Sequence, residues 1–350
     1  MRGEKRGQKN SIVDYIRGTE EIDAKYIKDI CYRGLDNFFE ENRAYSWLVL
    51  FGIFPQRYSQ WNNRQKELLS SYRSFLTATS TQNWHLSFFP NHYPLGDFGL
   101  DRNDLMAIIH GDVYRTCRLI FTLPPRCVNA PFTIPPADEI FVMWSEHIRR
   151  LERILYVFSY LNTGLSYMQG FNELVVPLYY VYVKGHSIFN ADPEESLDLA
   201  EAVCFFSFQA LLIEKQLYNV YLTKESQQII DIMNSFGEKQ RKHMPRIHSH
   251  LQAIGIMPFQ YALKWFSLMF LQEHELATSL TLWDTVLSRM DNLVEFLQYL
   301  GLGYLCLISD RLIGHGFSEA ISAIQNMEIH DVKKVINQAN IYLEIDYPNK

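Results

Sequence analysis

The apolar residues of this 350-residue chain are spaced as in α-helices from Ile22 almost to the end, and alternating strand-like runs are nearly absent. In residues 61–76 the apolar stripe consists of Trp61, Leu68, Leu69, Tyr72, Phe75 and Leu76. Such a stripe buries one face of a helix against a core. No internal repeat of fixed period is visible, which argues against an α-solenoid adaptor. The sequence therefore predicts an all-α fold.

Composition and length favour a large folded chain with a short tail. Hydrophobic residues make up 47% of the chain and aromatic residues 14%, which is enough for a sizeable core. We expect residues 1–20 to be a disordered basic tail, residues 21–190 an N-terminal helical lobe and residues 191–350 a C-terminal helical lobe.

Charge, cysteines and apolar runs limit the compartment and the partners. A net charge of −6 gives no field that attracts a phosphate backbone, so nucleic acid is not an expected partner. The five cysteines are scattered, and no signal-peptide core follows Met1, which favours a cytoplasmic protein. The longest apolar runs, residues 175–183 and 300–308, are shorter than the roughly 20 residues that cross a bilayer, so we interpret them as core helices.

A carboxylate interrupts the apolar stripe of a helix predicted from Asp101 to about Leu119. Ile109 belongs to this stripe, and Asp112 stands where the next apolar residue is expected. Arg115 lies three residues further on and can reach that carboxylate. In isolation the pair also fits a structural salt bridge, because a half-buried carboxylate needs a partner.

A second unusual stretch is YMQGFNE, residues 167–173, which places Gln169 in a turn before a helix that begins near residue 170. Taken alone, Gln169 also fits a turn residue that bonds to its own backbone. The long helix predicted for residues 137–161 could return the chain to the same end, so that Arg115 and Gln169 share one cleft. A guanidinium and a carboxamide cannot perform acid–base chemistry, but they can orient and stabilise a phosphoryl transfer on a partner.

These residues form I-x-x-D-x-x-R at 109–115 and Y-x-Q-G at 167–170, which resemble the two signature motifs of TBC-domain Rab GTPase-activating proteins. Four further blocks are similar to the family in order and spacing: R-x-x-x-W at 43–47, LFGIFP, RTCR, and KWFSLMFLQEHEL to TLWD at 264–284. The resemblance covers roughly residues 28–310, and residues 151–180 are most similar to the branch that contains TBC domain family member thirteen. Phe171 and Lys264 depart from the residues that are usual in the family.

The resemblance implies a two-lobed helical TBC fold that accelerates GTP hydrolysis by a GTP-bound Rab GTPase in vesicle trafficking. Arg115 is the implied arginine finger and Gln169 the implied glutamine finger. Supporting roles fall to Asp112, Tyr167, Gly170 and Ile109. Partner contact is a candidate role for Asn172 and Arg43, with helix capping and pairing to an acid such as Glu41 as the respective alternatives.

No cofactor of its own is expected for this chain, because GTP and Mg²⁺ are carried by the partner GTPase. The sequence contains no G-x-x-x-x-G-K-[ST] loop, and its histidine cluster at residues 243, 248 and 250 lacks the frame of a metal site. The alternative function is a catalytically inactive TBC-fold scaffold that binds a GTPase or another protein. Peripheral recruitment to endomembranes is expected only through the partner.

Overall fold

The computed structural model describes residues 11–35, 40–86, 100–127, 139–223 and 225–348, without the side chains of residues 11, 100–103, 117–118 and 139–140. Every regular element within these ranges is a helix and none is a strand, which confirms the all-α prediction. Residues 79–100 lose the helical spacing of apolar residues and predict a long loop, most of which lies outside the described residues.

Contacts divide the described residues into two compact units. Unit 1 lies within Met1–Ile27 and Phe38–Ala210, and unit 2 within Lys28–Asn37 and Leu211–Lys350. The division after Ala210 differs from the expected lobe boundary at residue 190. The first division falls inside α3 (Ala24–Tyr32), whose second half belongs to unit 2.

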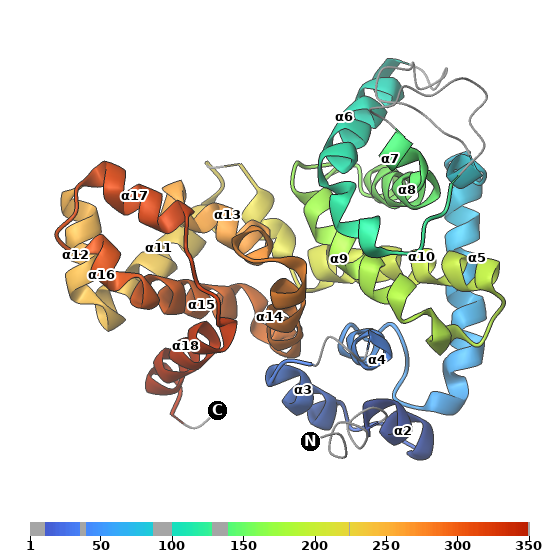
Figure 1. The fold of residues 1–350 in the computed structure, drawn as a ribbon, viewed down its shortest axis with the longest axis horizontal. Helices are drawn as coiled ribbons and strands as arrows, with labels where there is room; N and C mark the ends of the chain where they lie inside the picture. The colour runs from blue at the N-terminus through green and yellow to red at the C-terminus, as the bar shows by residue number, and fades with distance from the viewer. Residues whose placement is uncertain (1–10, 36–39, 87–99, 128–138, 224, 349–350) are drawn as a thin grey trace. The chain divides into compact units, whose positions relative to one another are not determined.

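Unit 1 is assembled around a central helix, α8 (Ser145–Leu161). The other helices of the unit are α2 (Ser11–Gly18), α4 (Glu40–Leu50), α5 (Trp61–Ala78), α6 (Leu100–Thr116), α7 (Glu139–Val142), α9 (Phe171–Lys184) and α10 (Pro193–Gln209). Helices α6, α9 and α10 all contact α8 and surround it (Figure 1). Because it is enclosed in this way, α8 buries charged side chains as well as its apolar stripe.

The buried charges of α8 are paired with a carboxylate of α10. Glu201 accepts hydrogen bonds from Arg153 Nε at 2.6 Å and Arg150 Nη1 at 2.6 Å, and from the Tyr72 hydroxyl of α5 at 2.8 Å. Although burial acts to raise it, the pKa of Glu201 lies below its usual value because the two guanidinium groups stabilise the carboxylate. The network therefore fixes how α5, α8 and α10 pack, since a buried charge without its partner is costly.

Two expectations for unit 1 were wrong. Residues 11–18 are not a disordered tail: they form α2, which packs on α4, buries Ile12 and Ile16, and places Arg17 Nη2 2.9 Å from the Tyr45 hydroxyl. The rest of the expected tail, residues 1–10, lies outside the described residues. The single helix predicted for residues 137–161 is instead α7 followed by α8, with non-helical backbone at Trp144, whose indole N–H donates to the Leu123 carbonyl at 2.9 Å.

Unit 2 is assembled around α15 (Leu293–Leu307), an almost entirely apolar helix. Its other helices are α11 (Gln227–His243), α12 (Pro245–Ala253), α13 (Ala262–Ser267), α14 (Leu276–Ser288), α16 (Ser309–Leu312), α17 (Phe317–Gln325) and α18 (Val332–Asp346). Helices α11, α13, α14 and α18 contact α15. The approach of α18 is close at Gly303, where an added Cβ would come within 2.6 Å of the Val335 carbonyl oxygen.

One helical run, Pro193–Glu214, has the length and mean hydropathy of a membrane-crossing segment. Of its most apolar window, 78% is buried inside the structure, as in the core helix of a folded domain.

Candidate functional site

Helix α6 carries the predicted arginine motif and packs against α8. Ile109 is fully buried, and the neighbouring His110 bonds through Nδ1 to Glu152, a carboxylate of α8 that also pairs with Arg149. The next turn of α6 contains Asp112 and Arg115. The position of this turn therefore depends on α8 as well as on the hydrogen bonds of α6 itself.

The predicted pair of Asp112 and Arg115 is present, with the carboxylate buried and the guanidinium exposed. Arg115 donates from Nη2 to Asp112 Oδ1, and the exposed fractions of the two side chains are 66% for Arg115 and 7% for Asp112. A buried carboxylate thus holds one terminal nitrogen of an arginine side chain that is otherwise mostly exposed. This arrangement leaves the guanidinium available to a second molecule.

Tyr167 joins the glutamine motif to the arginine motif. Its hydroxyl donates to Asp112 Oδ2 at 2.7 Å, on the carboxylate that also accepts from Arg115. Burial, together with the hydrogen bond to this carboxylate, raises the pKa of Tyr167 far above its usual value. The hydroxyl therefore stays protonated and acts as a donor. Two motifs separated by more than fifty residues meet at one carboxylate.

Gln169 lies in a tight loop between α8 and α9. The N–H groups of Leu165 and Ser166 both donate to the Asn162 carbonyl, at 3.0 and 2.8 Å, which closes the first half of the loop. Gly170 follows Gln169 with a φ of 105°, a conformation that side chains with a Cβ rarely adopt. The Gln169 side chain is exposed. Gly170 is thus required by the turn that presents Gln169.

The two residues considered for partner contact are buried, which corrects that expectation. Asn172 is 4% exposed and Arg43 is 2% exposed, so neither side chain can reach a docked protein. Asn172 does not cap α9 either, because its amide is used in bonds to α6 and to the glutamine loop. One of those bonds goes to Thr116, a residue that the sequence reasoning missed and that follows Arg115 directly. Its only sequence signal is its place in RTCR.

The site offers a guanidinium and a carboxamide but no free acid or base. Asp112 is occupied by Arg115 and Tyr167, and the Tyr167 proton is held by its raised pKa. Across the described part of the chain, no group of three or more His, Cys, Asp or Glu side chains is placed to hold a metal. Such a site can donate hydrogen bonds and positive charge to another molecule's reacting groups.

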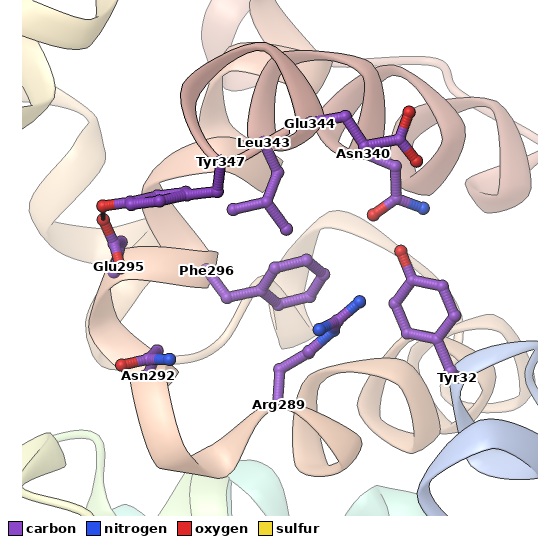
Figure 2. Close-up of a pocket in the computed structure, with 9 residues that line it drawn as sticks. All are labelled: Tyr32, Arg289, Asn292, Glu295, Phe296, Asn340, Leu343, Glu344 and Tyr347. Atoms are coloured by element: carbon purple, nitrogen blue, oxygen red, sulfur yellow. Dashed lines mark hydrogen bonds between the residues drawn. The ribbon is translucent and has the colours of Figure 1, made fainter. Parts of the chain in front are cut away.

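Unit 2 contains a separate cavity of about 100 Å³ between α15, α18 and the end of α3 (Figure 2). The Arg289 guanidinium lies 4.5 Å from the centre of the Tyr32 ring, and the Tyr347 hydroxyl donates to Glu295 at 2.7 Å. Glu295 and Glu344 bring two carboxylates to the lining beside this one guanidinium. None of the predicted site residues lines this cavity.

Comparisons with known proteins identify relatives that match more than half of this chain. A TBC domain-containing protein of Schizosaccharomyces pombe is 27% identical over 71% of this chain and 43% of its own length. Human TBC1 domain family member 13 is 31% identical over 55% of this chain and 47% of its own length. The chain thus spans less than half the length of these curated relatives.

The fold is shared with the crystal structure of the Ypt/Rab-GAP domain of Gyp1p, with a TM-score of 0.76 over 99% of both chains at 18% identity. The family described as the Rab-GTPase-TBC domain matches residues 132–313, which include Gln169 and begin after Arg115. This match covers more than half of the chain, and the chain therefore belongs to the Rab-GTPase-TBC domain family.

Proposed function

We propose that this chain is a GTPase-activating protein for a Rab-type small GTPase in its GTP-bound state. Arg115 supplies the arginine finger, and Gln169 supplies the glutamine finger. The observation that carries the proposal is the convergence on Asp112, which bonds at once to Arg115 and to Tyr167 of the glutamine loop. Both finger side chains are exposed, as groups that act on a second protein must be.

The proposed chemistry follows from the charge that develops during GTP hydrolysis. Negative charge builds up on the γ-phosphoryl oxygens and on the leaving oxygen, and water must be held in line with the bond that breaks. The Arg115 guanidinium stabilises this charge, and the Gln169 carboxamide orients the water. Asp112 holds Arg115 before the partner arrives, so less ordering entropy is lost at the transition state. The GTPase brings the nucleotide and Mg²⁺.

The alternative is a TBC-fold scaffold that binds a GTPase without changing its rate of hydrolysis. The family match alone does not separate these functions, because the matched residues begin after Arg115. The exposed guanidinium on a buried carboxylate favours catalysis, since a scaffold has no physical need to hold that rotamer. Recruitment to a membrane would follow from binding a membrane-associated GTPase.

The test is a hydrolysis screen across a panel of GTP-loaded Rab GTPases with catalytic amounts of this chain. Arginine fingers contribute about 10³ to 10⁵ in rate, so we expect Arg115→Ala and Gln169→Ala each to reduce the stimulation by at least about 100-fold. If both variants stimulate as well as the parent, the finger assignment is wrong. Binding without stimulation for every GTPase would favour the scaffold.

A matched control is available on α11. Arg241 is 67% exposed and pairs with Glu238 three residues earlier, so it repeats the exposure of Arg115 and its spacing from a carboxylate, but its partner Glu238 is exposed rather than buried. We expect Arg241→Ala to leave the stimulation unchanged. Gln252→Ala removes an exposed carboxamide from α12 and is the corresponding control for Gln169.

A further inference from the structure

We propose that Asn172 is a positioning residue that holds the two fingers in a fixed mutual arrangement, with Thr116 as its partner on α6. The inference rests on the proposed function and adds to it a buried clamp between the glutamine loop and the arginine helix. The clamp comprises four polar contacts of the single carboxamide of Asn172, two at Oδ1 and two at Nδ2.

The acceptor side of the carboxamide faces the glutamine loop. Asn172 Oδ1 accepts from the Gly170 N–H at 3.1 Å and lies 3.1 Å from the Tyr167 hydroxyl. The single proton of that hydroxyl is shared with Asp112 Oδ2, which is nearer at 2.7 Å. The carboxamide therefore contacts a residue on either side of Gln169.

The donor side of the carboxamide faces the last turn of α6. Asn172 Nδ2 donates to the Thr116 hydroxyl oxygen at 3.1 Å and to the Asp112 carbonyl at 3.3 Å. The Thr116 hydroxyl donates in turn to the Asp112 carbonyl at 3.1 Å, one helical turn back. These contacts lie on either side of Arg115, so the backbone that carries the guanidinium is fixed at both ends.

The orientation of the Asn172 amide is determined by its partners. The Gly170 N–H can only donate and the Asp112 carbonyl can only accept, so oxygen must face the loop and nitrogen must face α6. The side chain is 4% exposed, and water cannot replace these partners. Loss of the carboxamide would leave the Gly170 N–H without its acceptor and would remove the donor to Thr116 and to the Asp112 carbonyl, so contacts would be lost on both elements at once.

The clamp matters for catalysis because the two fingers act on one transition state. Ile109 and the His110–Glu152 bond locate α6 on α8, but neither contact reaches the glutamine loop. Besides the Tyr167–Asp112 bond, Asn172 at the start of α9 supplies a side-chain link from that loop to α6. A displacement of about 1 Å at a catalytic group can cost about 100-fold in rate.

The experiment compares Asn172→Ala and Thr116→Val with the parent in steady-state hydrolysis by a stimulated Rab GTPase. We expect kcat to fall about 10- to 100-fold for Asn172→Ala, and less for Thr116→Val, while KM for the GTP-loaded GTPase changes little. Thr116→Ser keeps the hydroxyl and is expected to retain the parent kcat. Unchanged kcat in Asn172→Ala, or equal loss in the Val and Ser variants of Thr116, would overturn the proposal.

A second comparison separates positioning from general damage to the fold. If Asn172 acts through Gln169, the loss caused by Asn172→Ala is smaller in a Gln169→Ala background than in the parent, because part of the benefit is already gone. The same fold-loss in both backgrounds would assign Asn172 a merely structural role and would contradict the inference.

Amide hydrogen exchange tests the clamp without any GTPase. We expect Gly170 N–H to exchange faster in Asn172→Ala than in the parent, with little change at Ile154 in the centre of α8. Unchanged exchange at the Gly170 N–H would contradict the proposed clamp. The proposed function fails if the parent stimulates no GTPase, or if Arg115→Ala and Gln169→Ala are fully active. The hydrogen-exchange result would still decide whether the clamp exists.

Discussion

The Asp112 carboxylate is almost fully buried, while the side chain of its ion-pair partner, Arg115, is mostly exposed to solvent. A surface ion pair with both partners exposed contributes little, because water and side-chain freedom compete with it. Because Asp112 is buried, water competes for the ion pair only at Arg115. The result is an arginine whose guanidinium is held through Nη2 while most of its side chain stays exposed.

The first prediction concerns the hydroxyl that completes this arrangement. Tyr167→Phe removes one oxygen and leaves Asp112 without its 2.7 Å donor. We expect the stimulation of GTP hydrolysis to fall about tenfold and the free energy of unfolding to fall by about 1 kcal/mol. Both quantities can be measured on the same preparation, by hydrolysis kinetics and by urea unfolding.

Tyr180→Phe is the matched control on α9. The Tyr180 hydroxyl makes no hydrogen bond to the described residues, so its removal is expected to change neither measurement. A Tyr167→Phe variant with parental activity would show that Asp112 does not need the hydroxyl to hold Arg115.

For single residues, the sequence predicts contacts between positions that are close along the chain. The spacing of Asp112 and Arg115 places both on one side of a helix, and their pairing follows from that spacing. The bonds from Tyr167 to Asp112 and from Asn172 to Thr116 join residues more than fifty positions apart. No local pattern specifies them, which is why Thr116 was missed and Asn172 was misjudged.

At the scale of elements, Gly303 determines how closely α15 and α18 of unit 2 can pack. At Gly303 of α15 an added Cβ would lie 2.6 Å from the Val335 carbonyl oxygen and 3.2 Å from its Cγ1. The nearer atom belongs to the backbone of α18 and cannot rotate away. The glycine lowers the helix propensity of α15 but permits this contact.

The second prediction follows from this contact. Gly303→Ala is expected to lower the free energy of unfolding by about 1 to 3 kcal/mol, because α18 must shift to admit the methyl group. Gly237→Ala in α11 is the control, since an added Cβ there meets nothing within 4 Å and alanine favours a helix. We expect that variant to gain up to about 1 kcal/mol. Equal effects in urea unfolding would contradict the packing argument.

Helix positions were easier to predict than helix ends. The helix predicted for residues 137–161 located α8, but the prediction did not reveal the break at Trp144, whose indole donates to the distant Leu123 carbonyl. Likewise α2 follows from burial of Ile12 and Ile16 against α4. Both features are set by contacts between elements, which periodicity within one element cannot show.

At the scale of the whole molecule, one buried and one half-buried histidine predict how stability depends on pH. Burial lowers the pKa of His147 in unit 1 and of His274 in unit 2 to about 4. For His147 the cause is desolvation of the buried ring, and the Pro124 carbonyl, which accepts from Nε2–H at 3.1 Å, acts in the opposite direction. In the neutral ring Nδ1 accepts from the Tyr179 hydroxyl at 2.8 Å. This buried ring is therefore neutral in the folded protein.

The third prediction is a loss of stability as the pH falls from about 6.5 to about 4. In this window the unfolded chain protonates its histidines while the folded chain does not, so the unfolded state binds more protons and is favoured. For His147 the loss is at most about 3 kcal/mol. We expect urea unfolding at several pH values to show a shallower dependence for His147→Gln than for the parent.

The buried carboxylates predict a second loss of stability at lower pH, separate from the loss caused by the histidines. Glu201 and Glu152 have folded-state pKa values below their usual value of 4.5, so the stability they contribute is complete above that pH and is lost as the pH falls through their lowered pKa values. His147→Gln should leave this lower transition in place. A His147→Gln variant with the parental pH dependence between 6.5 and 4 would disprove the assignment.

The all-α class, the approximate course of the helices and the pairs of residues that share one helix face can all be predicted from the sequence. These properties depend on the spacing of residues along the chain, and spacing is what a sequence records. The folded structure was needed to show that Asp112 is shared by Arg115 and Tyr167, and that Asn172 of α9 is buried against α6. Those facts depend on how α6 and α9 pack around α8, where the free energy comes from burial and hydrogen bonds between distant segments.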